Sequence, residues 1–495
     1  MRAYPLFRFG DIGSRATRQQ GGTITSMTDD FTWSRDHDQW LGRVDAHIRE
    51  WLDSSATRPV MAPADPHEVA RAFAEPLPEQ PTAVPEVLDL LAARAVPGLT
   101  AMDSGRFFGF VIGGMHPAAL GADLLATTWD QNAGLRAVTP SAAVVEDVAG
   151  SWLKQLLGLP EQASVGFVTG GNMASFAGLA AARHHVLKQH GWNVEELGLQ
   201  GAPRIRVLAS DERHVTIDAS LRYLGLGSAT TQLVASDDQG RMDIADLRAQ
   251  LLAEKGPTIV CLAAGNVNTG AFDDFHAAID QAHAHQAWVH VDGAFGLWAA
   301  TTPTKKSLTS GVEKADSWST DAHKWLNVPY DSGIVIVAHP ASHRETFQAG
   351  AAYLVQDSES ADPMEFVPEF SRRARGFAVW AALRSMGRSG VAALGERLCA
   401  NARLFAEQLA TIDGCEVVNE VVLNQVLVRF DDDDILTRHI VSDVVSSGVA
   451  YVGPTTFKGR GGMRISVCNG WTNSSDVELT AAAIATALDR RRGDT

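Results

Sequence analysis

The sequence is poor in cysteine and contains no long hydrophobic run. Its four cysteines are scattered over 495 residues without a CxxC pair, so neither a disulfide framework nor a zinc or other metal site is indicated, and a reducing cytoplasm is expected. Cys261 and Cys468 lie in short apolar runs and are expected as small core residues. No apolar run approaches the roughly 18 residues that cross a bilayer, so we expect no membrane-spanning segment.

Basic residues are also in deficit. Lysine and arginine number 42 against 58 aspartates and glutamates, a formal charge of -16, which argues against a nucleic-acid partner. The first 26 residues contain arginine, glycine and serine but not the apolar core of a secretory signal. We therefore expect residues 1–27 to form a disordered tail, with Met27 as a candidate translation start.

The hydrophobic patterns divide the chain into three further parts. Residues 28–105 alternate amphipathic helical patterns with proline-rich breaks, which predicts an N-terminal helical segment. In residues 106–385, helical runs alternate with short, almost continuous apolar runs. That alternation predicts an α/β domain with a mostly parallel sheet covered on both faces. Residues 386–495 combine long helical patterns with two strand patterns and predict a smaller α+β lobe, in which the acidic run 431–434 is a solvated loop or a helix N-terminus.

The segment SWSTDAHKWLNVPYDSG (317–333) contains an unusual lysine, Lys324. An ordinary lysine lies on a solvated face, but Lys324 is flanked by His323, Trp325 and small residues. We therefore expect its amine to point into an enclosed site. Removal from water favours the neutral amine, which Schiff-base chemistry needs.

Asp292 ends the apolar run AWVHVD and is followed by two small residues, Gly293 and Ala294. Carboxylates are seldom buried without a partner, and the end of a strand in an α/β sheet faces the usual ligand crevice. A pyridoxal ring needs such a carboxylate to keep its pyridine nitrogen protonated. The alternative is an aspartate that only caps the following helix.

Two weaker signals lie upstream. The segment VTGGNMASFAGLAAAR (168–183) predicts a strand, a glycine turn and a helix whose N-terminus can bind a phosphate. It is neither a GxGxxG nor a Walker A loop, which disfavours a nucleotide site. His214 follows the strand pattern 205–210 and either stacks on a flat ring in the same crevice or is an ordinary structural histidine.

The motifs DAHKWLN and HVDGAFG resemble those of the group II pyridoxal-phosphate-dependent amino-acid decarboxylases, over about residues 35–490. The resemblance implies a fold-type-I, aspartate-aminotransferase-like subunit that forms a homodimer. The active sites then lie at the interface, and residues 28–105 pack on the partner subunit. It also implies a small L-amino acid as substrate and pyridoxal 5'-phosphate as cofactor.

The resemblance assigns roles residue by residue. Lys324 carries the cofactor, Asp292 pairs with its ring nitrogen, Ala294 packs on one ring face and His214 on the other. The further cofactor-anchoring positions are Gly171, Asn172, Asp321 and His323. The family often has asparagine at position 321, and a carboxylate beside a phosphate is unfavourable, so we expect Asp321 to hold backbone or His323 instead.

Tyr353 matches a family tyrosine on a mobile loop that returns a proton to the substrate carbon after CO2 leaves; the alternative is a tyrosine that packs the loop base. Related aldehyde synthases have phenylalanine there, so a tyrosine favours simple decarboxylation. The positions that match the family's substrate pocket are Phe110, Val111, Ile112 and Gly113, with Trp129 and Asn132 as less secure additions. Their apolar members favour an aromatic substrate.

Two other functions remain open. An aminotransferase or oxidative deaminase would use the same cofactor. An aminotransferase would also need an arginine clamped to the substrate carboxylate, for which Arg464 is the candidate. A catalytically silent relative acting as a scaffold would lack the residue set above, and the chain has all of it.

Overall fold

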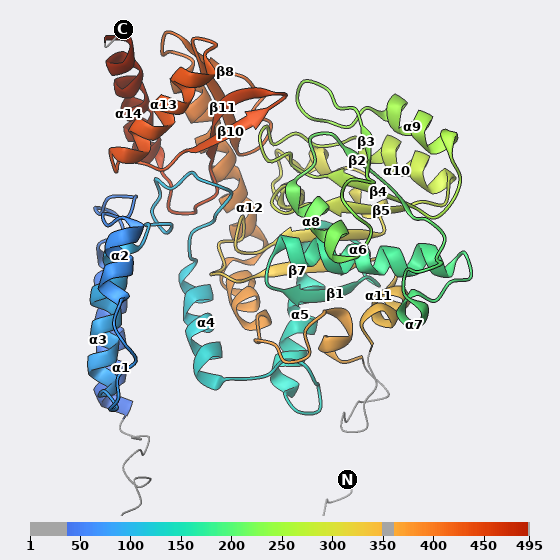
Figure 1. The fold of residues 1–495 in the computed structure, drawn as a ribbon, viewed down its shortest axis with the longest axis horizontal. Helices are drawn as coiled ribbons and strands as arrows, with labels where there is room; N and C mark the ends of the chain where they lie inside the picture. The colour runs from blue at the N-terminus through green and yellow to red at the C-terminus, as the bar shows by residue number, and fades with distance from the viewer. Residues whose placement is uncertain (1–36, 349–360, 494–495) are drawn as a thin grey trace, which may run out of the picture.

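The computed structural model describes residues 37–348 and 361–493. The N-terminal segment contributes α1 (His37–Asp53), α2 (Pro66–Phe73) and α3 (Val84–Ala95). Asp65 caps the N-terminus of α2, because its side chain accepts hydrogen bonds from the backbone N–H groups of His67 and Glu68. The Glu68 carboxylate in turn accepts a hydrogen bond from the backbone N–H of Asp65. Figure 1 shows α1, α2 and α3 standing together at one side of the molecule, and none of their residues is buried within the described chain.

Within the described chain, seven strands form the central sheet in the order β1-β7-β6-β5-β4-β2-β3. The strands from β6 to β3 are parallel neighbours, and β7 runs antiparallel to both β6 and β1. The mostly parallel sheet expected from the apolar runs is therefore confirmed. The strand bounds are β1 (Ser164–Val168), β2 (Arg206–Ser210), β3 (Gln232–Val234), β4 (Thr258–Ala263), β5 (Trp288–Asp292), β6 (Ser317–Asp321) and β7 (Gly333–Val337).

Both faces of this sheet are covered, which explains why its strands are apolar at successive positions. In β4, Ile259 and Cys261 pack in one core with α6, whereas Val260 and Leu262 pack in the other. Cys261 and Cys468 are both buried, as expected. The helices of this domain are α4 (Pro117–Trp129), α5 (Pro140–Leu157), α6 (Gly171–Lys188), α7 (Val194–Leu197), α8 (Val215–Tyr223), α9 (Ile244–Ala253), α10 (Phe275–Ala284) and α11 (Pro340–Phe347).

The C-terminal lobe is α+β, as predicted. Its antiparallel sheet has the order β10-β11-β9-β8, and Asp433, in the acidic run, caps α13. The long helix α12 links this lobe to the large domain (Figure 1), and it is interrupted at Gly387, which has a φ of 59°. The bounds are α12 (Gly376–Leu409), β8 (Cys415–Val417), β9 (Gln425–Phe430), α13 (Asp434–Ser446), β10 (Gly453–Phe457), β11 (Arg460–Ser466) and α14 (Ser474–Gly493).

The sequence also predicted a disordered N-terminal tail and no membrane-spanning segment. The tail expected over residues 1–27 lies outside the described residues. In the part that is described, no helix is long and apolar enough to cross a membrane.

Candidate active site

The carboxyl ends of the parallel strands bring the sequence-predicted residues together. Asp292 is the last residue of β5, and Asp321 is the last residue of β6, three positions before Lys324. Asp292 pairs in register with Ala263 of β4 and Ser319 of β6. His214 follows β2 and is the N-cap of α8. Because parallel strands present their carboxyl ends at one edge, these side chains lie around one crevice.

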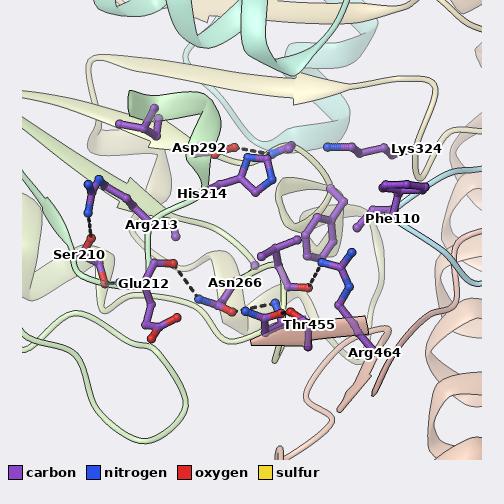
Figure 2. Close-up of a pocket in the computed structure, with 18 of the residues that line it drawn as sticks. Phe110, Ser210, Glu212, Arg213, His214, Asn266, Asp292, Lys324, Thr455 and Arg464 are labelled. Atoms are coloured by element: carbon purple, nitrogen blue, oxygen red, sulfur yellow. Dashed lines mark hydrogen bonds between the residues drawn. The ribbon is translucent and has the colours of Figure 1, made fainter. Parts of the chain in front are cut away.

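A cavity of about 410 Å³ occupies this crevice. Figure 2 shows the amine end of Lys324 pointing toward Asp292 and His214, with Phe110 next to Lys324 and Arg464 below Phe110 in this view. The sequence-predicted residues that line the cavity are Phe110, Val111, Ile112, His214, Asp292, Ala294 and Lys324, together with Arg464.

Asp292 has a local structural role as well as its position in the cavity. Its Oδ1 accepts the backbone N–H of Ala294 at 3.2 Å, which holds the tight turn after β5. The next helical residues begin only at Gly296, and Asp292 is not their N-cap. Asp292 therefore does not cap the following helix; it stabilises a turn, and its carboxylate lies at the cavity wall.

His214 is a half-buried imidazole whose proton affinity is reduced. Its Nδ1 lies 2.7 Å from the Thr216 hydroxyl, which fixes the ring at the start of α8. Burial lowers the pKa of His214, and the nearby Asp292 carboxylate offsets only part of that effect. The neutral ring can therefore present a flat face to the cavity without adding a charge.

Lys324 is held by an ion pair. Its Nζ lies 2.9 Å from Oδ2 of Asp321, whose side chain is 1% exposed. The other oxygen of Asp321 is 3.4 Å from Nε2 of His323. We expected Asp321 to hold backbone or His323, but its shorter contact is with Lys324, because β6 ends at Asp321 and the following turn brings the lysine back over it.

The glycine turn precedes α6, as predicted, and this helix N-terminus is open. Within the described chain no side chain caps it, so its first backbone N–H groups are free to bind an anion. Asn172 is oriented by Ser220, which donates to its backbone and side-chain oxygens at 3.2 and 3.4 Å. A Cβ on Gly171 would lie 2.6 Å from Oδ2 of Asp321, so the turn and the lysine's ion pair are in direct contact.

Three residues matched to the substrate pocket lie away from the cavity lining. Gly113 is buried against the backbone of Lys324 and donates its N–H to the His323 carbonyl at 3.1 Å. Trp129 ends α4 and meets Phe377 edge to face. The Asn132 side-chain oxygen accepts the backbone N–H groups of Gly134 and Arg372. Tyr353 lies outside the described residues.

The cavity also has lining residues that the sequence did not single out. Tyr330 stacks on His323 with ring centroids 4.2 Å apart, and Phe295 follows Ala294 in the turn after β5. Asn268 accepts the Thr455 hydroxyl at 2.6 Å, across the junction with the small lobe. The strand-end rule that selected Asp292 applies equally to the polar GNVN stretch after β4, and it would have identified Asn268.

The residues present fit a pyridoxal phosphate group. An amine for the aldehyde, a carboxylate for the ring nitrogen and a neutral flat ring line one crevice. The uncapped N-terminus of α6 lies beside it, against the Asp321 carboxylate that pairs with the amine. Within the described residues no cluster of histidine, cysteine and acidic side chains has the geometry of a metal site.

Comparison with known proteins identifies the same chemistry. Residues 66–431 match the pyridoxal-dependent decarboxylase conserved domain. The chain is 27% identical to an aromatic-L-amino-acid decarboxylase of Bacillus atrophaeus, over 87% of this chain and 91% of that protein. It is 30% identical to tryptophan decarboxylase 1 of Oryza sativa, over 76% and 79%.

The fold is shared with solved structures. The crystal structure of Oryza sativa TDC with PLP and tryptamine superposes with a TM-score of 0.86 at 24% identity, covering 93% of this chain and all of that chain. The fold-type-I architecture implied by the sequence motifs is thereby confirmed. Because the conserved domain spans most of the sequence, the protein belongs to the pyridoxal-dependent decarboxylase family and is a pyridoxal-phosphate-dependent amino-acid carboxy-lyase.

Proposed function

We propose that this carboxy-lyase converts an aromatic L-amino acid to its amine and CO2. The observation that carries the proposal is the composition of the cavity. An apolar wall of Phe110, Val111 and Ile112 faces the same space as Lys324 and Asp292. Phe110 is 58% exposed within one chain, so it is available to contact a flat side chain. Phe295 adds a second aromatic ring to the lining.

The charged residues of the cavity have separate tasks. Lys324 would hold the cofactor through its Nζ and would displace the product amine at the end of the cycle. Asp292 would hold a proton on the ring nitrogen, and His214 and Ala294 would pack on the two faces of the ring. When bound, the cofactor supplies the sink for the electron pair left on the substrate carbon as CO2 departs.

The remaining assignments concern the phosphate and the returning proton. Gly171 and Asn172 would offer backbone N–H groups at the start of α6 to the phosphate, and the His323 ring lies against the preceding Gly170. Tyr353 delivers a proton to the substrate Cα. Replacing Tyr353 by phenylalanine should slow amine formation and raise the fraction of aldehyde product, which chromatography of the products measures; an unchanged product ratio would exclude this role.

The substrate assignment is tested with a panel of L-amino acids. Aromatic, acidic, diamino and sulfinic amino acids are each incubated with the holoenzyme, and the amine and CO2 are measured. We expect the highest kcat/KM for an aromatic amino acid, and a Phe110→Ala variant should lose more kcat/KM for aromatic substrates than for the others. A preference for an acidic amino acid would overturn the aromatic assignment while leaving the carboxy-lyase chemistry intact.

Transamination is the second candidate function, because Arg464 could bind the substrate carboxylate. Its guanidinium lines the cavity, donates to the Val267 carbonyl at 3.1 Å, and has a buried Nε without a hydrogen-bond partner among the described residues. Burial lowers its pKa to about 10, so it remains charged at neutral pH. An arginine in this setting can bind a carboxylate. Equal amounts of CO2 and amine favour decarboxylation, whereas keto acid without CO2 favours transamination.

The N-terminal helices support a homodimer in which residues 28–105 pack on the partner subunit. Large apolar side chains on this segment are exposed in the single chain: Leu41, Leu52, Phe73, Val84, Val87, Leu90 and Leu91. Many exposed large apolar side chains on one segment favour an interface there. Light scattering should give the mass of a dimer, and Leu90→Asp should shift it toward the monomer. We also assign the enzyme to the cytoplasm, which cell fractionation tests.

A further inference from the structure

Lys324 is not a free amine in this structure, because Asp321 already holds it. Nζ and Oδ2 are 2.9 Å apart, with the carboxylate 1% and the lysine side chain 19% exposed. A carboxylate this deeply buried needs a positive partner, and Lys324 is its closest one. Loss of either charge would leave the other poorly compensated.

The same carboxylate also lies at the start of α6. A Cβ added to Gly171 would meet Oδ2 of Asp321 at 2.6 Å and Oδ1 at 3.4 Å. Oδ1 is buried and has no hydrogen-bond partner among the described residues. An anion beside a helix N-terminus is stabilised by the helix dipole, and α6 is 18 residues long with no side-chain cap. Asp321 therefore stands next to the position proposed for the cofactor phosphate.

We propose that Asp321 is a positioning residue that opposes cofactor capture, by retaining Lys324 in an ion pair and by placing a negative charge beside the phosphate position. The inference rests on the proposed roles of Lys324 and Gly171. During capture the lysine nitrogen gives up a proton and bonds to the aldehyde carbon of the cofactor, and one water is released. Asp321 slows the first step because the ion pair must be broken before the lysine nitrogen can react, and it weakens the final complex by repelling the phosphate.

If Asp321 instead helped to bind the cofactor, removing its charge would change the cofactor affinity in the opposite direction. His323 has a pKa lowered by burial, and the Asp321 carboxylate works against that shift. If Asp321 served mainly to keep His323 charged as a phosphate ligand, removing the carboxylate would weaken cofactor binding. The direction of the change therefore separates the two roles.

The test uses Asp321→Asn, which keeps the shape of the side chain and removes its charge. Cofactor is removed from the full-length protein, and pyridoxal 5'-phosphate is then added in a stopped-flow instrument. The absorbance of the lysine-bound cofactor gives the capture rate, and an equilibrium titration gives the affinity. We expect capture at least ~10-fold faster and binding at least ~10-fold tighter than in the wild type, about 1.4 kcal/mol.

Two further variants make each outcome decisive. Asp316→Asn removes a carboxylate just before β6 that pairs with His283 and His339, away from Lys324, and it should leave capture unchanged. Asp321→Ser serves if the asparagine variant does not fold, as judged by circular dichroism of the cofactor-free protein. Capture that is unchanged or slower in a folded Asp321 variant overturns the inference. Lysine-bound absorbance that persists in Lys324→Ala would instead overturn the proposed function.

Discussion

A single methyl group at Gly113 should disturb the position of Lys324. A Cβ at this residue would lie 2.0 Å from the Lys324 carbonyl oxygen and 3.0 Å from its carbonyl carbon. Ordinary carbon–oxygen contacts are about 3.3 Å, so the two backbones must move apart by roughly 1 Å. The motion also strains the hydrogen bond from Gly113 to the His323 carbonyl.

The expected cost of Gly113→Ala falls mainly on catalysis. Misplacement of a reacting group by about 1 Å reduces rates by about 10²-fold, whereas overpacking of this kind lowers stability by only about 1–3 kcal/mol. The assay is CO2 release under saturating cofactor, with thermal unfolding measured in parallel. Gly121→Ala is the matched control, because a Cβ on Gly121 meets no atom within 4 Å. Wild-type kcat in a stably folded Gly113→Ala protein would refute the reasoning.

Three further changes have outcomes that follow from the contacts. Asp292→Ala should weaken cofactor binding in an equilibrium titration and lower kcat about 10²-fold or more; unchanged affinity would remove Asp292 from the site. Glu146→Ala leaves the fully buried Arg372 guanidinium without the two carboxylate oxygens 2.8 Å away, so urea unfolding should show a loss of about 3–5 kcal/mol, with a smaller loss for Glu146→Gln. The pKa of His184 is raised, chiefly by its hydrogen bond to Glu195, so its stabilising effect is complete below its unfolded value of about 6.5 and is lost as pH rises. The stability difference between wild type and His184→Gln should therefore shrink on going to higher pH, and a growing difference would contradict this assignment.

Much of the fold and the centre of the site could be predicted from local pattern. Continuous apolar runs such as 258–264 identified strands of a doubly covered sheet, because burial on both faces removes the usual alternation. Asp292 and His214 were found because parallel strands bring their carboxyl ends to one edge. Lys324 was found because its neighbours are too apolar for a solvated face.

The rest depends on contacts between distant segments. Gly113 matched a pocket position in sequence, but it packs against the Lys324 backbone more than 200 residues away. Asn268 and Thr455 meet only where the small lobe docks on the large domain. The pairing of Asp321 with Lys324 depends on the turn after β6, which residue spacing alone does not specify.

The central claim is that Lys324 carries the cofactor, and chemical trapping tests it most directly. Reducing the holoenzyme with borohydride fixes the cofactor to the amine that holds it, and mass spectrometry of the digested protein then identifies the modified peptide. The account predicts a single adduct on the peptide that contains Lys324, absent from Lys324→Ala. An adduct on a different lysine, or an adduct that persists in Lys324→Ala, would contradict it.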